Sequence, residues 1–154
     1  MKVYLGLGTN LGNKKQHLHD AVQQISERIG EIVSLSAFYE TAPWGFSSEN
    51  SFLNAALCVE TSLPPLSVLR VTQAIEQELG RTAKSVNHTY ADRVIDIDLL
   101  LYSDITVEVE GLTIPHPLMT ERRFVMEPLA EIAPDLYHPL IGKTMQQLLE
   151  MLSN

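Results

Sequence analysis

The chain has 154 residues, of which 45% are hydrophobic, and this length and composition predict a single globular domain spanning residues 1–154. No apolar run approaches the roughly 20 residues that cross a bilayer. Gly8, Asn10 and Gly12 interrupt the amino terminus, where a signal peptide would be apolar. We therefore expect a cytoplasmic protein with no membrane partner. The net charge of −8 argues against a nucleic-acid partner, because such proteins neutralise phosphates with a basic face.

The first half of the chain predicts a strand, a helix and two further strands. Residues 2–9 alternate in polarity, and residues 13–30 place apolar residues at helical spacing before Gly30. The polarity of residues 31–41 also alternates, and residues 51–62 are expected to form an apolar strand. The connection between these two segments is too short for a helix, so the two strands should pair antiparallel. Cys58 lies in the second of them and is expected to be a small core residue, because a lone cysteine makes no internal disulfide.

The second half predicts one more helix and one more strand. Residues 64–80 begin with proline, carry apolar residues at helical spacing and close on Gly80. A polar loop, 81–92, leads to the strand "VIDIDLLLY" at residues 94–102, which a hairpin at 105–115 and a helical segment at 144–152 follow. The order βαββαβ predicts an α+β fold with a ferredoxin-like core, an added hairpin and C-terminal helices.

The glycine-rich stretch "GLGTNLG" at residues 6–12 also invites a dinucleotide-binding interpretation. Its spacing, GxGxxxG, is one residue too long for that fingerprint. A Rossmann sheet also requires a crossover helix between the second and third strands, and this chain has no room for one. We therefore favour a turn that leads into the first helix.

Two aspartates interrupt the apolar strand at residues 94–102. Strand side chains alternate, so Asp96 and Asp98 share one face with Val94 and Leu100. The opposite face is expected to carry Ile95, Ile97, Leu99 and Leu101. An exposed face would tolerate the repulsion of the two carboxylates, about 2–3 kcal/mol at an intermediate dielectric.

Covered carboxylates would instead need a cation. The acidic face also carries apolar residues, and a strand that is apolar on both faces is usually buried on both faces by other elements. Paired carboxylates suit Mg²⁺, which completes its ligands with water and substrate phosphates. Five of the eleven basic residues also lie between positions 81 and 123, namely Arg81, Lys84, Arg93, Arg122 and Arg123. Solvated loop charge is the alternative for these residues, but together with the aspartates they indicate a metal and nucleotide site.

A second group of residues suggests a pocket for a flat heteroaromatic ligand. Thr41, Trp44, Phe46, Phe52 and Asn54 combine aromatic rings with hydroxyl and amide groups. Each residue taken alone is also compatible with a core or turn position. Asn54 is the most informative, because an amide in an apolar strand must find hydrogen-bond partners.

Several motifs occur in order over nearly the whole chain: "GLGTNLG", "FYETAPWG", "FLNAA", "RVIDIDLLLY", "IPHP" with "ERRFVMEPL", and "EIAPDL". In this combination the chain resembles the 6-hydroxymethyl-7,8-dihydropterin pyrophosphokinases of folate biosynthesis. The resemblance implies a diphosphokinase that transfers the terminal diphosphate of ATP to the hydroxymethyl group of the reduced pterin and releases AMP. It also implies small-molecule substrates, with a monomer expected.

The resemblance assigns roles to individual positions. Two Mg²⁺ ions would be held by Asp96 and Asp98, which act in catalysis with Arg81 and Arg93. The pterin pocket would comprise Thr41, Pro43, Trp44, Phe52, Asn54 and Phe124, with the two phenylalanines stacking on the heterocycle. The ATP side would comprise Gln73, Glu76, Arg81, Lys84, Arg93, Leu99, Thr113, His116 and Arg122. The family pattern has a second basic residue at the position where this chain has Ala83, and the neighbouring Lys84 would take its place.

Two other classes of protein share the βαββαβ order. An RNA-recognition module would show paired aromatics on a basic sheet. A non-catalytic regulatory domain would have no use for an aspartate pair beside clustered arginines. The histidines other than His116 are expected at the surface, because none has a partner at metal-ligand spacing: His17, His19, His88 and His138.

Overall fold

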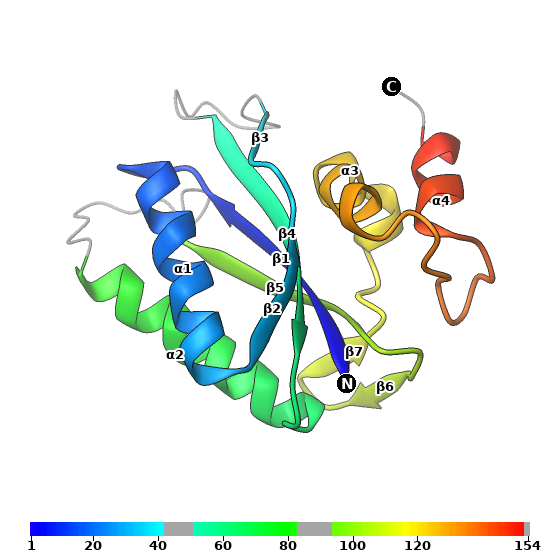
Figure 1. Ribbon diagram of the computed structural model, residues 1–154, viewed down its shortest axis with the longest axis horizontal. Coiled ribbons are helices and arrows are strands. Elements are labelled where there is room, and N and C mark those ends of the chain that lie inside the picture. Colours follow the sequence, from blue (N-terminus) through cyan, green and yellow to red (C-terminus); the bar gives the residue numbers. More distant parts are fainter. Residues whose placement is uncertain (42–50, 83–93, 153–154) are drawn as a thin grey trace.

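The computed structural model, which describes residues 1–41, 51–82 and 94–152, confirms the expected α+β fold (Figure 1). Its main sheet has five strands in the order β2-β4-β1-β5, and the short β3 pairs with β4 beside β2. The strands of this sheet are β1 (Lys2–Thr9), β2 (Glu31–Leu35), β3 (Tyr39–Thr41), β4 (Phe52–Glu60) and β5 (Asp96–Tyr102). All of their pairings are antiparallel, as a ferredoxin-like sheet requires.

Helices cover both faces of this sheet, as Figure 1 shows. On one face lie α1 (Lys14–Arg28) and α2 (Pro65–Thr82), which bury Leu18, Ile25 and Ile75 against strand residues such as Leu5 and Leu57. On the other face lie α3 (Arg123–Ile132) and α4 (Met145–Met151), which form a second core with Tyr4 and Cys58. The strands β1, β4 and β5 contribute apolar residues to both cores, so polar side chains within them need a particular reason.

The expected hairpin and C-terminal helix are also confirmed. The hairpin consists of β6 (Val107–Val109) and β7 (Leu112–Ile114), and its turn uses Gly111 at a φ of 87°, which favours glycine. A short 3₁₀ helix, Met119–Glu121, leads into α3. Helix α4 begins with a capping box in which Thr144 and Gln147 satisfy each other's backbone N–H groups. In the described ranges, no helix combines the length and apolar character needed to cross a membrane.

Several element boundaries differ from the sequence prediction, and one helix was missed. The single strand expected at residues 31–41 is divided into β2 and β3, because Ser36 turns inward and its hydroxyl accepts a hydrogen bond from the Ala56 N–H. Helix α2 does not end at Gly80 but continues through Arg81 to Thr82. Helix α3 was not located in the sequence, because Pro128 lies inside it.

The face predicted for Leu101 is wrong. Tyr4 pairs with Leu101 and Leu5 pairs with Leu99, so Leu100 is an extra residue in β5. This bulge moves Leu101 from the core under α1 and α2 to the core under α3 and α4, because one inserted residue inverts the alternation. Asp96 and Asp98 precede the bulge and keep their predicted common face.

The surface position predicted for His138 is also wrong. His138 is only 5% exposed, and its Nδ1 accepts hydrogen bonds of 3.2 Å from the N–H groups of both Leu140 and Ile141. His19 is exposed and its ring contacts Phe38, with 5.2 Å between the centroids. Cys58 is buried as expected. His88 lies outside the described residues.

Candidate active site

The floor of the candidate site is formed by β1, which carries glycine at both positions beside the aspartates. Asp98 pairs with Gly6 and Asp96 pairs with Gly8 across the two strands. A Cβ on Gly8 would lie 3.0 Å from Oδ1 of Asn54, and a Cβ on Gly6 would contact Leu100. Because glycine has no side chain, β1 places no side chain beside either carboxylate, and the side chains of Leu100 and Asn54 approach the backbone of β1 closely instead. Gly6 and Gly8 belong to the glycine-rich stretch at residues 6–12, and in the structure they are the partners of the two aspartates.

Asn54 lies in the same cross-strand row as Asp96. Gly8 pairs with Asn54 on one side and with Asp96 on the other, so Asn54 and Asp96 share a sheet face two strand spacings apart, about 10 Å. Asn54 is 5% exposed, and its Nδ2 donates a hydrogen bond of 3.2 Å to Oγ1 of Thr41. The structure therefore brings the predicted pterin residues Thr41 and Asn54 next to the predicted metal residues.

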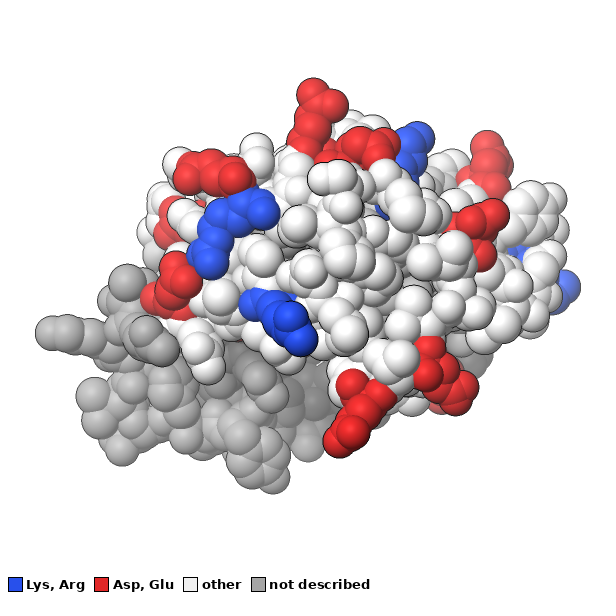
Figure 2. Space-filling view, turned by 90° about the horizontal axis from the view of Figure 1, so that it is seen from below, with Lys and Arg blue, Asp and Glu red and all other residues white. Residues whose placement is uncertain are grey.

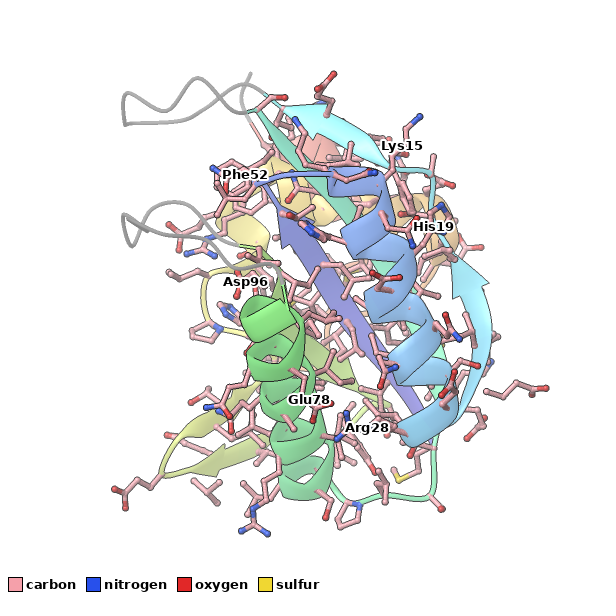
Figure 3. The ribbon with its side chains drawn as sticks, turned by 90° about the vertical axis from the view of Figure 1, so that its left-hand side faces the viewer. Lys15, His19, Arg28, Phe52, Glu78 and Asp96 are labelled. Atoms are coloured by element: carbon pink, nitrogen blue, oxygen red, sulfur yellow. The ribbon has the colours of Figure 1, made fainter. Side chains whose placement is uncertain are left out.

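Phe52 belongs to the same end of the sheet. It begins β4 and pairs with Thr41. In Figure 3, Phe52 and Asp96 both lie above Glu78 and Arg28, which form an ion pair of 3.1 Å between α2 and α1. The aromatic ring, the amide and the carboxylates thus occupy one end of the sheet.

A cavity of about 460 Å³ opens beside β5, between α2 and the β6–β7 hairpin. This volume lies within the range of sites for small molecules. It brings together seven residues that the family resemblance assigns to ATP or metal: Gln73, Glu76, Asp96, Asp98, Leu99, Thr113 and His116. These residues come from three segments that are far apart in the chain, so the cavity supports their common assignment to one site.

Five further residues line this cavity and were missed by the sequence analysis: Leu69, Ile97, Gly111, Leu112 and Pro117. Leu69 and Leu112 provide apolar wall, which suits the face of a nucleotide base. No motif distinguishes such residues from ordinary core residues, because only the packing of α2 and the hairpin against β5 turns them toward the cavity.

The outer edge of β5 contributes backbone groups to the cavity. The Ile97 N–H donates a hydrogen bond of 2.7 Å to Oε2 of Glu76. Ile97 lies between the two aspartates, so the carboxylate of Glu76 ties α2 to the centre of the acidic stretch. Because backbone groups in an antiparallel pair alternate in direction, the N–H of Leu99 faces the same edge. Leu99 therefore offers its backbone, and not its buried side chain, to a ligand.

His116 projects from the segment after β7, which is attached to β5 by a hydrogen bond of 3.0 Å from the His116 N–H to the Leu100 carbonyl. Its Nδ1 accepts a hydrogen bond of 3.2 Å from the Leu118 N–H, so the neutral ring carries its proton on Nε2. Burial, together with the Arg122 guanidinium, lowers the pKa of His116, whereas the Asp96 carboxylate opposes this shift. Near neutral pH the ring is therefore a neutral hydrogen-bond donor.

Arg122 and Phe124 lie where α3 begins. The guanidinium carbon of Arg122 is 5.7 Å from the centroid of the Phe124 ring, within cation–π range. Phe124 is 41% exposed, so one side of its ring is accessible to a ligand. Arg122 does not line the cavity beside β5, although its charge acts on His116.

Several predicted site residues are not tested by the structure. Pro43, Trp44, Lys84 and Arg93 lie outside the described residues, and the backbone of Arg81 is described in α2 but its side chain is not.

The donor set fits a Mg²⁺ site that is completed by substrate. Among the described residues, no three of the side chains His, Cys, Asp and Glu come together as a protein-only metal site. Asp96 and Asp98 are both half-buried on one face, and each pairs with a glycine of β1. Mg²⁺ commonly binds one or two carboxylates and takes its other ligands from water and phosphates, so two half-buried carboxylates are sufficient.

The charges on the visible surface do not resemble a nucleic-acid interface. On the face in Figure 2, the described basic side chains lie apart from one another and acidic side chains are spread among them. Nucleic-acid binders instead gather basic residues into a continuous patch. This distribution is compatible with small-molecule substrates.

Comparison with known proteins identifies close relatives. Residues 4–134 match the family model described as 7,8-dihydro-6-hydroxymethylpterin-pyrophosphokinase. The chain is 49% identical to the 2-amino-4-hydroxy-6-hydroxymethyldihydropteridine pyrophosphokinase of Porphyromonas gingivalis over 89% of this chain and 93% of the relative. It is 43% identical to the enzyme of the same name from Methylorubrum extorquens over 98% of this chain and 93% of the relative.

A similar fold occurs in the wild-type HPPK-DHPS of Plasmodium falciparum. The TM-score is 0.76 at 20% identity, over 97% of this chain and 43% of that chain. The chain thus spans less than half of this longer protein, and at this identity the likeness supports the fold alone.

Proposed function

The chain belongs to the 7,8-dihydro-6-hydroxymethylpterin-pyrophosphokinase family and is a pyrophosphokinase of folate biosynthesis, and on this premise we propose how it works. The proposed reaction transfers the terminal diphosphate of ATP to the hydroxymethyl group of 6-hydroxymethyl-7,8-dihydropterin, in the presence of Mg²⁺. The hydroxymethyl oxygen bonds to the β-phosphorus of ATP, and the bond from this phosphorus to the α–β bridging oxygen breaks. AMP leaves with the bridging oxygen, and the hydroxyl proton passes to water.

The observation that carries this proposal is the row formed by Asn54, Gly8 and Asp96. Because glycine occupies the middle position, no side chain of β1 lies between the amide and the carboxylate. A pterin held by Asn54 would thus lie beside phosphates held near Asp96. Phosphoryl-type transfer depends mainly on such positioning and on charge neutralisation, so no covalent nucleophile is needed.

On the pterin side, each residue has a distinct role. Thr41 and Asn54 bind the polar edge of the heterocycle and reject analogues that lack the matching groups, because a buried amide without partners costs free energy. Phe52 and Phe124 stack on its faces, and Pro43 and Trp44 complete the pocket. Stacking fixes the plane of the ring, so the hydroxymethyl group is oriented toward the phosphates.

On the nucleotide side, Asp96 and Asp98 would hold two Mg²⁺ ions on the triphosphate, where the metal neutralises charge at the transferring group. His116 donates its Nε2–H to a phosphate oxygen. Glu76 holds the edge of β5 in place for the nucleotide, with Leu99 offering backbone groups. The rest of the ATP site is formed by Gln73, Arg81, Lys84, Arg93, Thr113 and Arg122, and among these the arginines offset the negative charge of the phosphates.

Product analysis tests this proposal directly. The purified protein is incubated with ATP, Mg²⁺ and 6-hydroxymethyl-7,8-dihydropterin, and the nucleotides are separated afterwards. AMP should form in an amount equal to the pterin diphosphate, and chelation of Mg²⁺ should stop the reaction. Formation of ADP would mean transfer of a single phosphoryl group and would exclude the proposed chemistry.

The proposal also includes a monomeric catalytic domain that acts on small molecules in the cytoplasm. The two bacterial relatives support a single domain, because the chain covers 93% of each of them. Sedimentation equilibrium with and without substrates tests the monomer, and a mass of two chains would contradict it.

A further inference from the structure

Lys14 lies in a polar cluster at the start of α1. Its Nζ donates hydrogen bonds of 3.1 Å to both the carbonyl oxygen and Oγ of Ser51, and it lies 3.8 Å from Oε2 of Glu40. Ser51 Oγ in turn donates a hydrogen bond of 2.7 Å to Oε2 of Glu40. We call these three residues the Lys14 cluster. The ammonium group thus donates two hydrogen bonds to Ser51 and forms an ion pair with Glu40.

The cluster differs from an ordinary surface ion pair. The Lys14 side chain is 25% exposed, whereas that of Glu40 is 66% exposed, so the ammonium is the more enclosed partner. Exposed ion pairs contribute little, but a charged group with several hydrogen bonds contributes more. Lys14 is also the first residue of α1, where a cation is unfavourable because of the helix dipole. The contacts of Lys14 therefore have to outweigh an unfavourable position.

The residues that Lys14 contacts are direct neighbours of the proposed pterin residues. Glu40 precedes Thr41 in β3, and Ser51 precedes Phe52 in β4. Thr41 pairs with Phe52, and the next pair along these strands is Glu40 with Leu53. Lys14 thus joins both strands to α1 at the position where the pocket begins.

This end of β3 depends on such side-chain contacts. Strand β3 is only three residues long and pairs with one strand, β4. From the other side of the sheet, Glu131 of α3 accepts hydrogen bonds from the Tyr39 hydroxyl and from the Ala37 N–H. Glu131 fixes the beginning of β3, and the Lys14 cluster fixes its end, where Thr41 binds Asn54.

We propose that Lys14, through Glu40 and Ser51, is a positioning residue for the pterin pocket. It sets the separation of Thr41 and Phe52 without touching the substrate itself. The inference rests on the proposed function, because that function assigns these two residues to the pterin. It predicts that loss of the ammonium weakens pterin binding and leaves the nucleotide side, which β5 and α2 form, unaffected.

The test uses Lys14→Met, with Lys15→Met as its matched control. Both changes remove one positive charge from the first turn of α1, and Lys15, which Figure 3 labels, is exposed. The affinity for 6-hydroxymethylpterin is measured by its own fluorescence, and KM values for pterin and ATP are determined separately. Lys14→Met should weaken pterin binding about fivefold to tenfold, as expected for a lost charged hydrogen-bonding group, with the KM for ATP changed less than about twofold. Lys15→Met should behave as the parent does.

Two further variants separate positioning from a general loss of structure. Lys14→Arg keeps the charge and donors and should restore most of the pterin affinity. Glu40→Gln should weaken pterin binding in the parent but add little to Lys14→Met, because both changes disrupt one cluster. Unchanged pterin affinity in Lys14→Met, or an equal rise in both KM values, would overturn the inference. Neither result would affect the proposed function as long as the unmutated protein turns over ATP and pterin. An unmutated protein that binds no pterin would refute the proposed function itself.

Discussion

Replacement of both Asp96 and Asp98 by asparagine is expected to abolish turnover without weakening the metal-free fold. The register of β5 puts both carboxylates on one face, about 6.5–7 Å apart at the backbone. At an effective dielectric constant of about 20, two such charges repel by about 2–3 kcal/mol, and partial exposure to solvent reduces this to about 1 kcal/mol. Asparagine has nearly the same shape and removes this repulsion.

The melting temperature of the double variant should therefore differ from that of the parent in one way without ligand and in another way with ligand. In the absence of metal the double variant should melt at the same temperature as the parent or a few degrees higher. With Mg²⁺ and a nonhydrolysable ATP analogue at about 100 times Kd, the parent should gain about 2.7 kcal/mol, or about 5–10 °C for a chain of this size. The double variant should gain almost nothing, and its rate of AMP formation should fall about 1000-fold or more, because charge neutralisation at the transferring group is lost.

The assay is thermal melting with and without ligand, followed by AMP formation per folded molecule. Asp104→Asn combined with Asp135→Asn serves as the control, because it changes the net charge equally at exposed positions away from the cavity. This control should keep both the ligand shift and the activity of the parent. A double variant at Asp96 and Asp98 that unfolds readily, yet retains its activity per folded molecule, would mean that the aspartates are scaffolding and that the metal assignment is wrong.

Three further predictions concern other parts of the structure. Gly8→Ala places a methyl group 3.0 Å from Oδ1 of Asn54, so pterin affinity in a fluorescence titration should fall about tenfold, and parent-like affinity would show that the amide can move freely. Glu76→Ala removes the acceptor of the Ile97 N–H and should lower the free energy of unfolding in urea by about 1–2 kcal/mol, whereas Glu76→Gln, which keeps an acceptor, should lower it less. Burial lowers the pKa of His138 in the folded protein below its usual value of about 6.5. When the pH falls below about 6.5, the unfolded chain therefore binds a proton at this residue more readily than the folded protein does. The folded protein loses stability over this range, until the pH passes the lower folded-state pKa. His138→Asn keeps an acceptor near the Nδ1 position and should therefore show a smaller drop in melting temperature between pH 7.5 and pH 5 than the parent, and equal drops would contradict this account.

Much of the architecture could be predicted from local patterns in the sequence. The helical spacing of residues such as Leu18 and Ile25 located α1, because a helix buries one stripe of its surface whatever it packs against. The period-2 alternation of β5 similarly predicted that Asp96 and Asp98 share a face. These predictions succeeded because each pattern depends only on near neighbours along the chain.

Two failures have different causes, a distant strand in one case and a local turn in the other. Leu101 changed faces because β1 pairs with β5 through a bulge, and β1 lies some ninety residues earlier in the chain. His138 became buried because the backbone around it folds back and offers two N–H groups to its Nδ1. The bulge leaves no signal in the residues around Leu101, because it depends on the pairing with β1.

For the candidate site, the sequence by itself determined which chemical groups are present: the aspartate pair, the amide of Asn54, the histidine after β7 and the aromatic residues. Only the tertiary structure decided that Gly8 lies between Asn54 and Asp96 and that α2 and the hairpin close a cavity beside β5. It also decided that Lys14 reaches across to Ser51. The physical reason is that strand register and helix packing result from hydrogen bonds and contacts between residues far apart in the chain, whereas periodicity reports only how a segment divides its own surface between core and solvent.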